Sequence, residues 1–470
     1  MKKQRSSFTS RIGFVLAAAG SAVGLGNLWR FPYLAAKYGG GTFLLVYIIL
    51  AVTFGFTLMI AEIAIGRRTR LSCIGAYRAL DKRFGFLGWL ASLVPVIIAP
   101  YYCVIGGWVI KYLLDFLTGH GIQAAADTYF SDFTAMSLPG VLNSPVTWFV
   151  VYVLLNTVVV LCGVEKGIEK VSGVMMPVLI ILSIVIACYS LTIPGAGAGL
   201  KYYLLPRMED FSIYTVLAAM GQLFYSMSLA MGIMITYGSY MQKDSILEHS
   251  VTQIEVFDTG FALLAGLMII PAMVAFSGGD TALVRENAGA GLMFGVLPKV
   301  FESMLFGGVV GTVFFVLVLL AAMTSSISLM ETIVSILVDK LRIGRKVATI
   351  GVTIGILIIG LPSCLGYGPL SAIMPLGMAF LDFFDFISNS IMMPIVAFLT
   401  CILIGHIAGP QTVIDEVESS GPFHRKKLFV VMIRWIAPVM LLMILATEIL
   451  KFLGVITCDR PQIANLPDAQ

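Results

Sequence analysis

The chain has 470 residues, of which 59% are hydrophobic and 12% charged, and its formal net charge is +4. A soluble globular domain of this length would have too few polar residues to cover its core, so the composition excludes that class. The small net charge reflects the placement of loop residues and does not indicate a nucleic-acid partner. The sequence predicts an all-α polytopic membrane protein.

Eleven apolar segments are long enough to cross about 30 Å of hydrocarbon as helices. In chain order they cover residues 12–36, 41–66, 87–117, 146–163, 168–190, 213–240, 251–277, 303–338, 346–362, 381–405 and 428–454. The basic segment Met1–Arg11 leads into a full-length span without a small-residue cleavage site, so we expect no removable signal peptide. The cysteines form no CxxC or Cys/His cluster, which favours apolar packing over metal binding.

Lys and Arg are distributed unequally between the connections. The N-terminus and the even-numbered connections are rich in them, as in Arg67–Arg70 and Arg425–Lys427, whereas the opposite side has few. Because cytoplasmic loops carry this excess, we predict a cytoplasmic N-terminus and, with eleven spans, an extracytoplasmic C-terminus. The outer loop Gly278–Lys299, rich in glycine and polar residues, is a candidate lid.

Two segments are interrupted at mid-depth. The first contains GSAVGLGNLWRFP, residues 20–32, with three glycines, Asn27 and Arg30 in the middle of a span. The sixth contains YSMSLAMG, Tyr225–Gly232, where two serines and a glycine interrupt an apolar helix. Non-helical backbone at this depth is tolerated only where it lines a cavity enclosed by protein. The alternative for the first segment is close packing of two helices through its glycines.

The two interruptions lie five segments apart, which is the arrangement expected of two inverted five-helix repeats. We expect a single transporter domain, 1–470, with residues 12–190 and 213–405 as the repeats and residues 428–454 as an additional helix. In such a fold, half-helix N-termini direct N–H groups at anions, and freed carbonyls bind cations. A central site can then hold a zwitterion together with hard cations.

The segment GSAVGLGNLWRFPY closely resembles the signature of the neurotransmitter:sodium symporter family. The resemblance recurs in order along nearly the whole chain, in YYCVIGGW, GQLFYSMSLAMGIMITYGSY, LLAGLMIIPAMVAF, AAMTSSISLMET and FLDFFDF. It implies the fold of the bacterial leucine transporter LeuT, a 5+5 inverted repeat with discontinuous helices 1 and 6. It also implies sodium-coupled symport by alternating access, with no cofactor besides the coupling ion.

The resemblance implies two sodium sites, which need oxygen ligands because Na⁺ is a hard cation. The hydroxyls of the TSS run in span 8, taken alone, are better explained by bonds back to the preceding helical turn, and the resemblance reverses this interpretation. One implied site consists of the carbonyls of Gly20, Val23 and Ala321 and the hydroxyls of Thr324 and Ser325. The other consists of the Ala22 carbonyl, the Asn27 amide oxygen, Ser226 and the polar position of span 7, Asp258.

Asp258 lies about one turn inside the membrane, where a carboxylate is costly unless it is paired. In chloride-dependent members of the family, a bound anion balances the sodium charge at this locality. A fixed carboxylate makes that anion unnecessary, so we predict chloride-independent transport. Whether Asp258 ligates sodium or lies just behind it stays open, since this helix aligns only to within one turn.

The implied substrate is an amino acid, because Gly24 stands where monoamine-transporting relatives carry an Asp. The position lacks that charge and is expected to have room for it, so the substrate brings its own carboxylate to the Leu25 and Gly26 N–H groups and the Tyr102 hydroxyl. Met231, flexible and polarizable, favours a large hydrophobic or aromatic side chain. The implied binding residues are Ser21, Ala22, Gly24, Leu25, Gly26, Ile98, Tyr102, Tyr225, Ser226, Ser228, Met231, Ser325 and Leu329.

The resemblance also implies gates made of charge pairs. Arg30 and Asp385 match the outer pair, with Asp382 on the same helical face. The implied inner gate consists of Arg5 and Asp339 with Tyr240 nearby, and Phe8 stands where the family usually has Trp. Two buried polar residues, Glu62 and Gln222, are expected to brace the broken helices, and Glu331 and Lys111 have no assigned role.

Other functional classes remain to be weighed. An intramembrane enzyme would need a catalytic constellation, but the four His lie in loops or at span ends and no HExxH motif is present. A proton-coupled transporter of the same fold would have a Lys or Arg near Gly20 or Thr324, and none is found there. A channel or a non-transporting substrate sensor would keep the same binding residues. We therefore expect a sodium symporter of the bacterial inner membrane.

Overall fold

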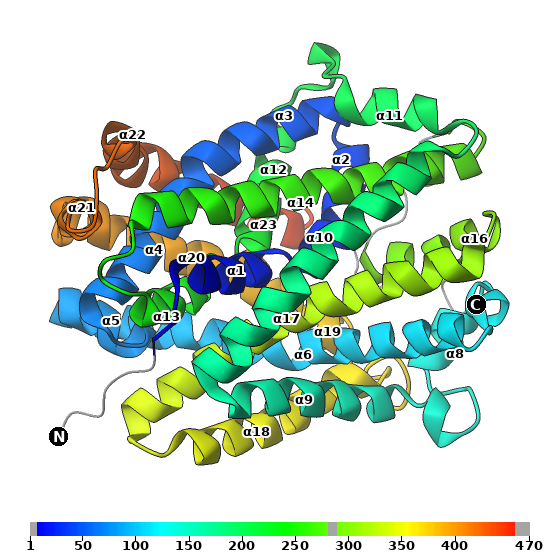
Figure 1. Ribbon diagram of the computed structural model, residues 1–470, viewed down its shortest axis with the longest axis horizontal. Helices are drawn as coiled ribbons and strands as arrows, with labels where there is room; N and C mark the ends of the chain where they lie inside the picture. Colours follow the sequence, from blue (N-terminus) through cyan, green and yellow to red (C-terminus); the bar gives the residue numbers. More distant parts are fainter. Residues whose placement is uncertain (1–6, 281–288, 456–470) are drawn as a thin grey trace.

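The computed structural model describes residues 7–280 and 289–455, which form helices and connecting loops (Figure 1). Within these residues, eight helices are long and apolar enough to cross a membrane, and a bent helix pair makes a ninth candidate. The eight cover Gly41–Thr69, Lys82–Leu117, Val164–Leu191, Leu247–Phe276, Gly307–Leu341, Arg345–Leu365, Phe380–Ile407 and Lys426–Phe452. The all-helical membrane architecture predicted from the sequence is confirmed.

The remaining predicted spans are helical but shorter. The helix α9 (Pro145–Leu161) covers the fourth, and the pair α12 (Ile213–Ser226) and α13 (Ile233–Tyr240) covers the sixth. The helix α9 has 17 residues, and α12 and α13 have 14 and 8, so none of them belongs to the eight long helices above. The count of eleven spans therefore stays a prediction. The boundary of the eighth span differs: α17 (Gly307–Leu341) starts four residues later than expected because Phe306 has a left-handed backbone conformation.

The first span is broken where its glycines predicted. The helix α1 (Arg11–Ala22) ends at Val23, whose backbone is extended, and a π-helical turn, η1 (Gly26–Arg30), leads into α2 (Phe31–Lys37). The two halves meet at an angle of 50°. Carbonyls at the end of α1 thereby lose their intrahelical partners and become available to a ligand.

The sixth span is broken by three left-handed residues. Ser228, Ala230 and Gly232 have φ angles of 53°, 59° and 71°, which separate α12 from α13. A positive φ is uncommon for residues other than glycine and costs energy that the surrounding structure must offset. The break lies within Tyr225–Gly232, the segment that its serines and glycine marked in the sequence.

The broken helices lie at the centre of the molecule. Figure 1 shows α1 in the middle, in contact with α10 (Lys170–Leu191), α14 (Leu247–Phe276) and α17. At the periphery, α10, α18 (Arg345–Leu365) and α23 (Ala437–Phe452) expose many large apolar side chains. Such a surface suits hydrocarbon and places the polar site in the protein interior.

Two long loops carry short helices. The loop after α6 (Gly85–Leu117) contains α7 (Gly121–Ala124), α8 (Tyr129–Thr134) and η4 (Val141–Asn143). The second loop continues through η7 (Gly291–Val296) into α16 (Leu297–Glu302). Its residues 281–288 lie outside the described part, so the role of Gly278–Lys299 as a lid stays a prediction.

Candidate functional site

A small cavity lies where the two broken helices meet, with a volume of about 30 Å³. All thirteen residues expected to bind substrate line it, together with Asn27 and Ile233. They come from the break of the first span, α6, the break of the sixth span and α17. Sequence reasoning missed Ile233, although it directly follows the glycine that ends the second break.

The walls of the cavity are polar where the helices are unwound. The backbone N–H of Leu25 points at the Tyr102 hydroxyl at 3.2 Å, and the Ser228 hydroxyl donates to the Ser21 carbonyl at 2.9 Å. The Ser325 hydroxyl donates to the same carbonyl at 3.1 Å. An unwound backbone, a phenol and two serines therefore surround one point. This donor and acceptor set suits the two ends of a zwitterion.

Gly24 has less space beside it than the sequence suggested. A Cβ there would lie 2.6 Å from the Ser325 hydroxyl oxygen and 3.0 Å from the Tyr102 hydroxyl oxygen. The expectation of room for a carboxylate at this position is therefore wrong, because side chains from α17 and α6 fill it. Gly26 is similarly enclosed, since a Cβ would lie 2.4 Å from the Tyr225 ring.

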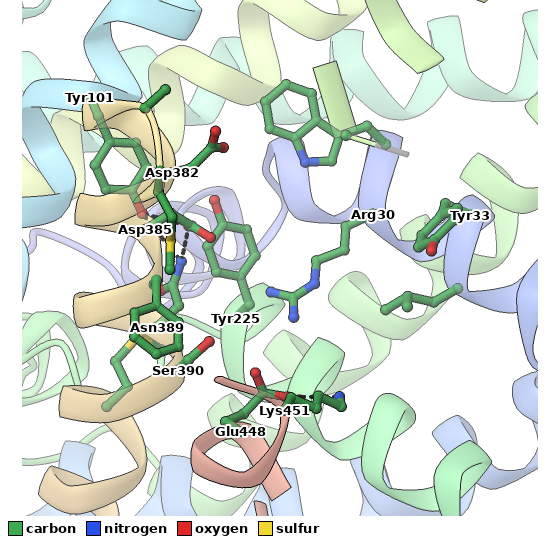
Figure 2. Close-up of a pocket in the computed structure, with 18 of the residues that line it drawn as sticks. Arg30, Tyr33, Tyr101, Tyr225, Asp382, Asp385, Asn389, Ser390, Glu448 and Lys451 are labelled. Carbon is green, nitrogen blue, oxygen red and sulfur yellow. Dashed lines mark hydrogen bonds and ion pairs between the residues drawn. The ribbon is translucent and has the colours of Figure 1, made fainter. Parts of the chain in front are cut away.

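A second, larger cavity of about 920 Å³ lies next to the first (Figure 2). Its wall includes Arg30, Tyr101, Asp382 and Asp385, and Tyr225 lines both cavities. The small cavity holds about one water molecule. Tyr225 thus forms part of the partition between the large open cavity, here called the vestibule, and the small cavity.

The expected outer gate pair faces this vestibule without forming an ion pair. The Arg30 guanidinium lies 5.5 Å from the centre of the Tyr225 ring, and its buried Nε has no hydrogen-bond partner among the described residues. Asp385 accepts hydrogen bonds from the Tyr101 hydroxyl at 3.0 Å and from the Asn389 amide. Figure 2 shows Arg30 apart from the Asp385 cluster, so the vestibule stays open between them.

Asp258 lies in a fully buried oxygen cluster. Its Oδ1 accepts from the Asn27 amide at 2.9 Å, and its Oδ2 accepts from the Ser226 hydroxyl at 3.1 Å and the Tyr47 hydroxyl at 3.2 Å. Asn27 and Ser226 were both expected here. Tyr47 was missed, because a tyrosine in an apolar span has no distinguishing motif. The cluster provides one charge and several neutral oxygens, a donor set that fits Na⁺.

The residues expected to form the other sodium site also meet. The Ser325 hydroxyl points at the Val23 carbonyl at 3.5 Å, and the Thr324 hydroxyl donates to the Ala321 carbonyl at 3.0 Å. A Cβ on Gly20 would lie 3.2 Å from the Thr324 Cβ, so glycine lets α1 approach α17 closely. Thr324 also bonds back to the preceding turn, at 3.2 Å from the Leu320 carbonyl. The back-bonding interpretation and the ligand interpretation therefore apply to the same hydroxyl.

The opposite end of the site is sealed. Phe8 is fully buried, with its ring packed edge-on against Phe14, Tyr237 and Tyr240. The expected gate residue Asp339 accepts a hydrogen bond from the Ser72 N–H at 2.7 Å. The other member of that pair, Arg5, lies outside the described residues.

Polar residues tie the broken helices to their neighbours. The Tyr240 hydroxyl donates to Glu331 at 2.8 Å, and Glu331 pairs with Arg345 at 2.5 Å. Glu62 accepts from the Ala230 N–H in the break of helix 6 at 2.7 Å, and Gln222 donates to the Gly26 carbonyl at 2.9 Å. The contacts of Glu62 and Gln222 are those expected of braces. No sequence motif linked Glu331 to Arg345, since they belong to different helices.

The chain is similar to known proteins over nearly its whole length. The model of the "Sodium:neurotransmitter symporter family" matches residues 5–127 and 120–461. An uncharacterized sodium-dependent transporter of Bacillus subtilis (strain 168), YhdH, is 36% identical over 402 residues, which are 84% of this chain and 87% of that protein. An uncharacterized sodium-dependent transporter of Haemophilus influenzae is 31% identical over 95% of this chain and 99% of its own length.

A solved structure has the same architecture. The crystal structure of MhsT in complex with L-phenylalanine superposes with a TM-score of 0.83 at 35% identity. The match covers 95% of this chain and 100% of MhsT. The overall fold is thus shared with a relative that was crystallised with an amino acid.

Proposed function

Because the chain belongs to the sodium:neurotransmitter symporter family, we propose that this sodium-dependent transporter carries a large hydrophobic or aromatic L-amino acid. One observation carries the proposal: both broken helices contribute to one small cavity whose walls combine unwound backbone with the Tyr102 hydroxyl and two serines. The amino-acid carboxylate is held by the N–H groups of Leu25 and Gly26 and by Tyr102. The ammonium group meets the carbonyl and hydroxyl oxygens of the two breaks.

The side chain of the substrate lies among apolar groups. Ile98, Met231 and Leu329 line the cavity beside the Tyr225 ring. Met231 adapts its shape and packs well against aromatic rings. The L-phenylalanine bound to MhsT supports this substrate class. A cavity of about 30 Å³ is too small for such a substrate, so binding requires the cavity to widen, with Tyr225 moving toward the vestibule.

Sodium binds at two oxygen-rich positions next to the substrate. One contains Asn27, Ser226 and Asp258, and the other contains the ends of α1 and the hydroxyls of Thr324 and Ser325. The direct hydrogen bonds from Asn27 and Ser226 to Asp258 support a ligand or immediate neighbour role for this carboxylate. Its fixed charge replaces an external anion, so transport proceeds without chloride.

Alternating access accounts for the open vestibule and the sealed opposite end. We assign residues 12–190 and 213–405 as the inverted repeats and residues 428–454 as an additional helix. The vestibule faces the exterior of a bacterial inner membrane, and the end sealed by Phe8 faces the cytoplasm, as the distribution of Lys and Arg indicates. Closure of Arg30 onto Asp385 follows substrate binding, while Arg5 and Asp339 act at the inner end.

A scintillation-proximity binding screen of all amino acids, with and without Na⁺, tests the substrate class. We expect aromatic or large aliphatic L-amino acids to bind only with Na⁺. Failure of tryptophan, tyrosine, phenylalanine and leucine to bind would refute the proposal. Counterflow in proteoliposomes separates the alternatives, because a sensor binds without exchange and a proton-coupled transporter exchanges without Na⁺. Uptake that fails in gluconate buffer would refute chloride independence.

A further inference from the structure

A single buried carboxylate accepts hydrogen bonds from the two residues that directly precede α1. Glu169 ends the π-helical turn η5 (Val164–Glu169) and is almost fully buried. It accepts from the Thr9 N–H at 2.8 Å, the Thr9 hydroxyl at 2.7 Å, the Ser10 N–H at 3.2 Å and the Ser10 hydroxyl at 3.1 Å. All four donors are neutral, and they belong to two consecutive residues. The carboxylate therefore fixes a short piece of backbone.

The fold leaves space for this carboxylate at one glycine. A Cβ on Gly13 would lie 1.9 Å from Glu169 Oε1, and its two next nearest atoms, at 2.4 and 2.5 Å, also belong to Glu169. Gly13 has no positive φ, so its backbone alone does not call for glycine. The absence of a side chain at position 13 is therefore explained by the Glu169 carboxylate.

The segment held in this way seals the inner end of the site. Phe8 immediately precedes Thr9, and its ring packs against Phe14, Tyr237 and Tyr240. Its N–H donates to the Tyr240 carbonyl at 3.0 Å, which joins it to the end of α13, the inner half of the broken sixth helix. Glu169 thus connects the start of α10 with Phe8, the residue that packs against α13 and closes this end of the site; we call Phe8 the plug.

Capping of α1 does not explain the contact. The helix is already capped by the Ser10 hydroxyl, which accepts from the Gly13 N–H at 2.9 Å. Glu169 instead satisfies the N–H groups of Thr9 and Ser10, which lie before the helix. Its charge also lies near the positive end of the α1 dipole, where an anion is favoured.

We propose that Glu169 is a positioning residue for transport: it clamps Thr9 and Ser10 to the start of α10 and thereby keeps Phe8 in the inner seal. The proposal rests on the alternating-access function proposed above. Loss of the clamp frees the segment from Phe8 to Ser10 and favours the state in which the site opens to the cytoplasm.

Hydrogen–deuterium exchange of the full-length protein tests the clamp without requiring knowledge of the substrate. In Glu169→Gln, one acceptor oxygen is replaced by a donor, and we expect the amides of Thr9 and Ser10 to exchange about 10- to 100-fold faster. The matched control is Glu165→Gln, an exposed residue of the same turn, which should leave this exchange unchanged. Unchanged exchange at Thr9 and Ser10 in Glu169→Gln would overturn the proposal.

A double-mutant cycle separates the clamp from the stability of α1. Glu169→Ala removes the carboxylate and should accelerate exchange of the Thr9 and Ser10 amides. Gly13→Ala displaces the same carboxylate while improving helix propensity, so it should accelerate their exchange to a similar extent. In the Glu169→Ala background, Gly13→Ala should add nothing, because the carboxylate that it displaces is gone. Additive effects of the two substitutions would show that Gly13 acts independently of Glu169 and would contradict the clamp.

The consequence for the seal is measured by labelling of Tyr237→Cys with a thiol reagent, in a background in which the native cysteines have been replaced. Glu169→Gln should raise its labelling rate by a thiol reagent from the cytoplasmic side about tenfold, without accelerating exchange in α17 or α6. Faster exchange in all helices would indicate global destabilisation and refute a specific positioning role. Since neither measurement uses substrate, a failed amino-acid screen leaves these results interpretable, and a failed clamp leaves the proposed transport intact.

Discussion

Gly24 illustrates how one missing side chain specifies a binding site. The atoms opposite it are the Ser325 and Tyr102 hydroxyl oxygens, at 2.6 and 3.0 Å from an added Cβ. Both hydroxyls belong to the proposed substrate and sodium sites. Any side chain at position 24 must displace these two hydroxyls, which we propose to bind the ligands, so the position calls for glycine for reasons of space as well as charge.

Gly24→Ala is therefore expected to weaken amino-acid binding about 10- to 100-fold, because overpacking costs about 1–3 kcal/mol. Equilibrium binding with Na⁺ present measures the effect. Gly173→Ala, in α10 with nothing within 4 Å of its added Cβ, is the matched control and should bind normally. Equal affinities in the two variants would show that the cavity adapts and that Gly24 does not shape it.

Asp258 is the residue on which the chloride prediction depends. Asp258→Asn keeps the shape of the side chain but removes the charge beside Asn27 and Ser226. We expect uptake in gluconate buffer to fall about tenfold or more, and chloride to restore part of it, since an anion then balances Na⁺. Asp244→Asn, an exposed loop residue, is the control. A variant equally active in both buffers would remove Asp258 from the charge balance.

At the level of elements, the break of the sixth helix depends on backbone geometry. Gly232 immediately precedes α13 and has a φ of 71°, and a Cβ there would lie 2.9 Å from the Cys73 sulfur. The serines and glycine indicated a weak point, and the structure contains one there. The left-handed conformations of Ser228 and Ala230 have no local signal, because they are imposed by contacts such as the Glu62–Ala230 hydrogen bond.

Gly232→Ala should destabilise the protein by about 1–2 kcal/mol, since a left-handed conformation costs this much for a residue with a Cβ. It should also lower amino-acid affinity, because Ser228 and Met231 belong to the same break. The control Gly351→Ala lies in α18 with open space around its Cβ and should be neutral or stabilising. Thermal unfolding and binding measured together test the point. A Gly232→Ala protein as stable as Gly351→Ala would show that the hinge tolerates a side chain.

At the level of the whole molecule, buried charges join distant segments at the end sealed by Phe8. Arg67, at the end of α4 (Phe56–Thr69), is fully buried and pairs with Glu416 of α21 (Gln411–Glu418) at 2.7 Å. It also donates to the Ser245 carbonyl, between α13 and α14, at 2.8 Å. One guanidinium thus connects three parts of the chain that are far apart in sequence.

Arg67→Met should lower the free energy of unfolding by about 2–3 kcal/mol, because the Ser245 carbonyl loses this donor and Glu416 keeps the half-exposed Lys243, at 2.7 Å, in place of a fully buried guanidinium. Arg68→Met, which removes an exposed guanidinium that donates to the Thr412 carbonyl at 3.0 Å, should change it by less than about 0.5 kcal/mol. Chemical unfolding in detergent compares the two. Equal stabilities would show that Arg67 does not join these segments.

The sequence by itself determined the membrane class, the positions of the two breaks and all of the residues that line the small cavity except Ile233. These follow from local rules: apolar length, glycines at mid-depth and hydroxyls in apolar helices, together with a family signature. Only the tertiary structure decided the lack of space at Gly24, the contact of Tyr47 with Asp258 and the clamp between Glu169, Thr9 and Gly13. The physical reason is that each depends on side chains from helices distant in sequence, whose relative placement no local pattern encodes.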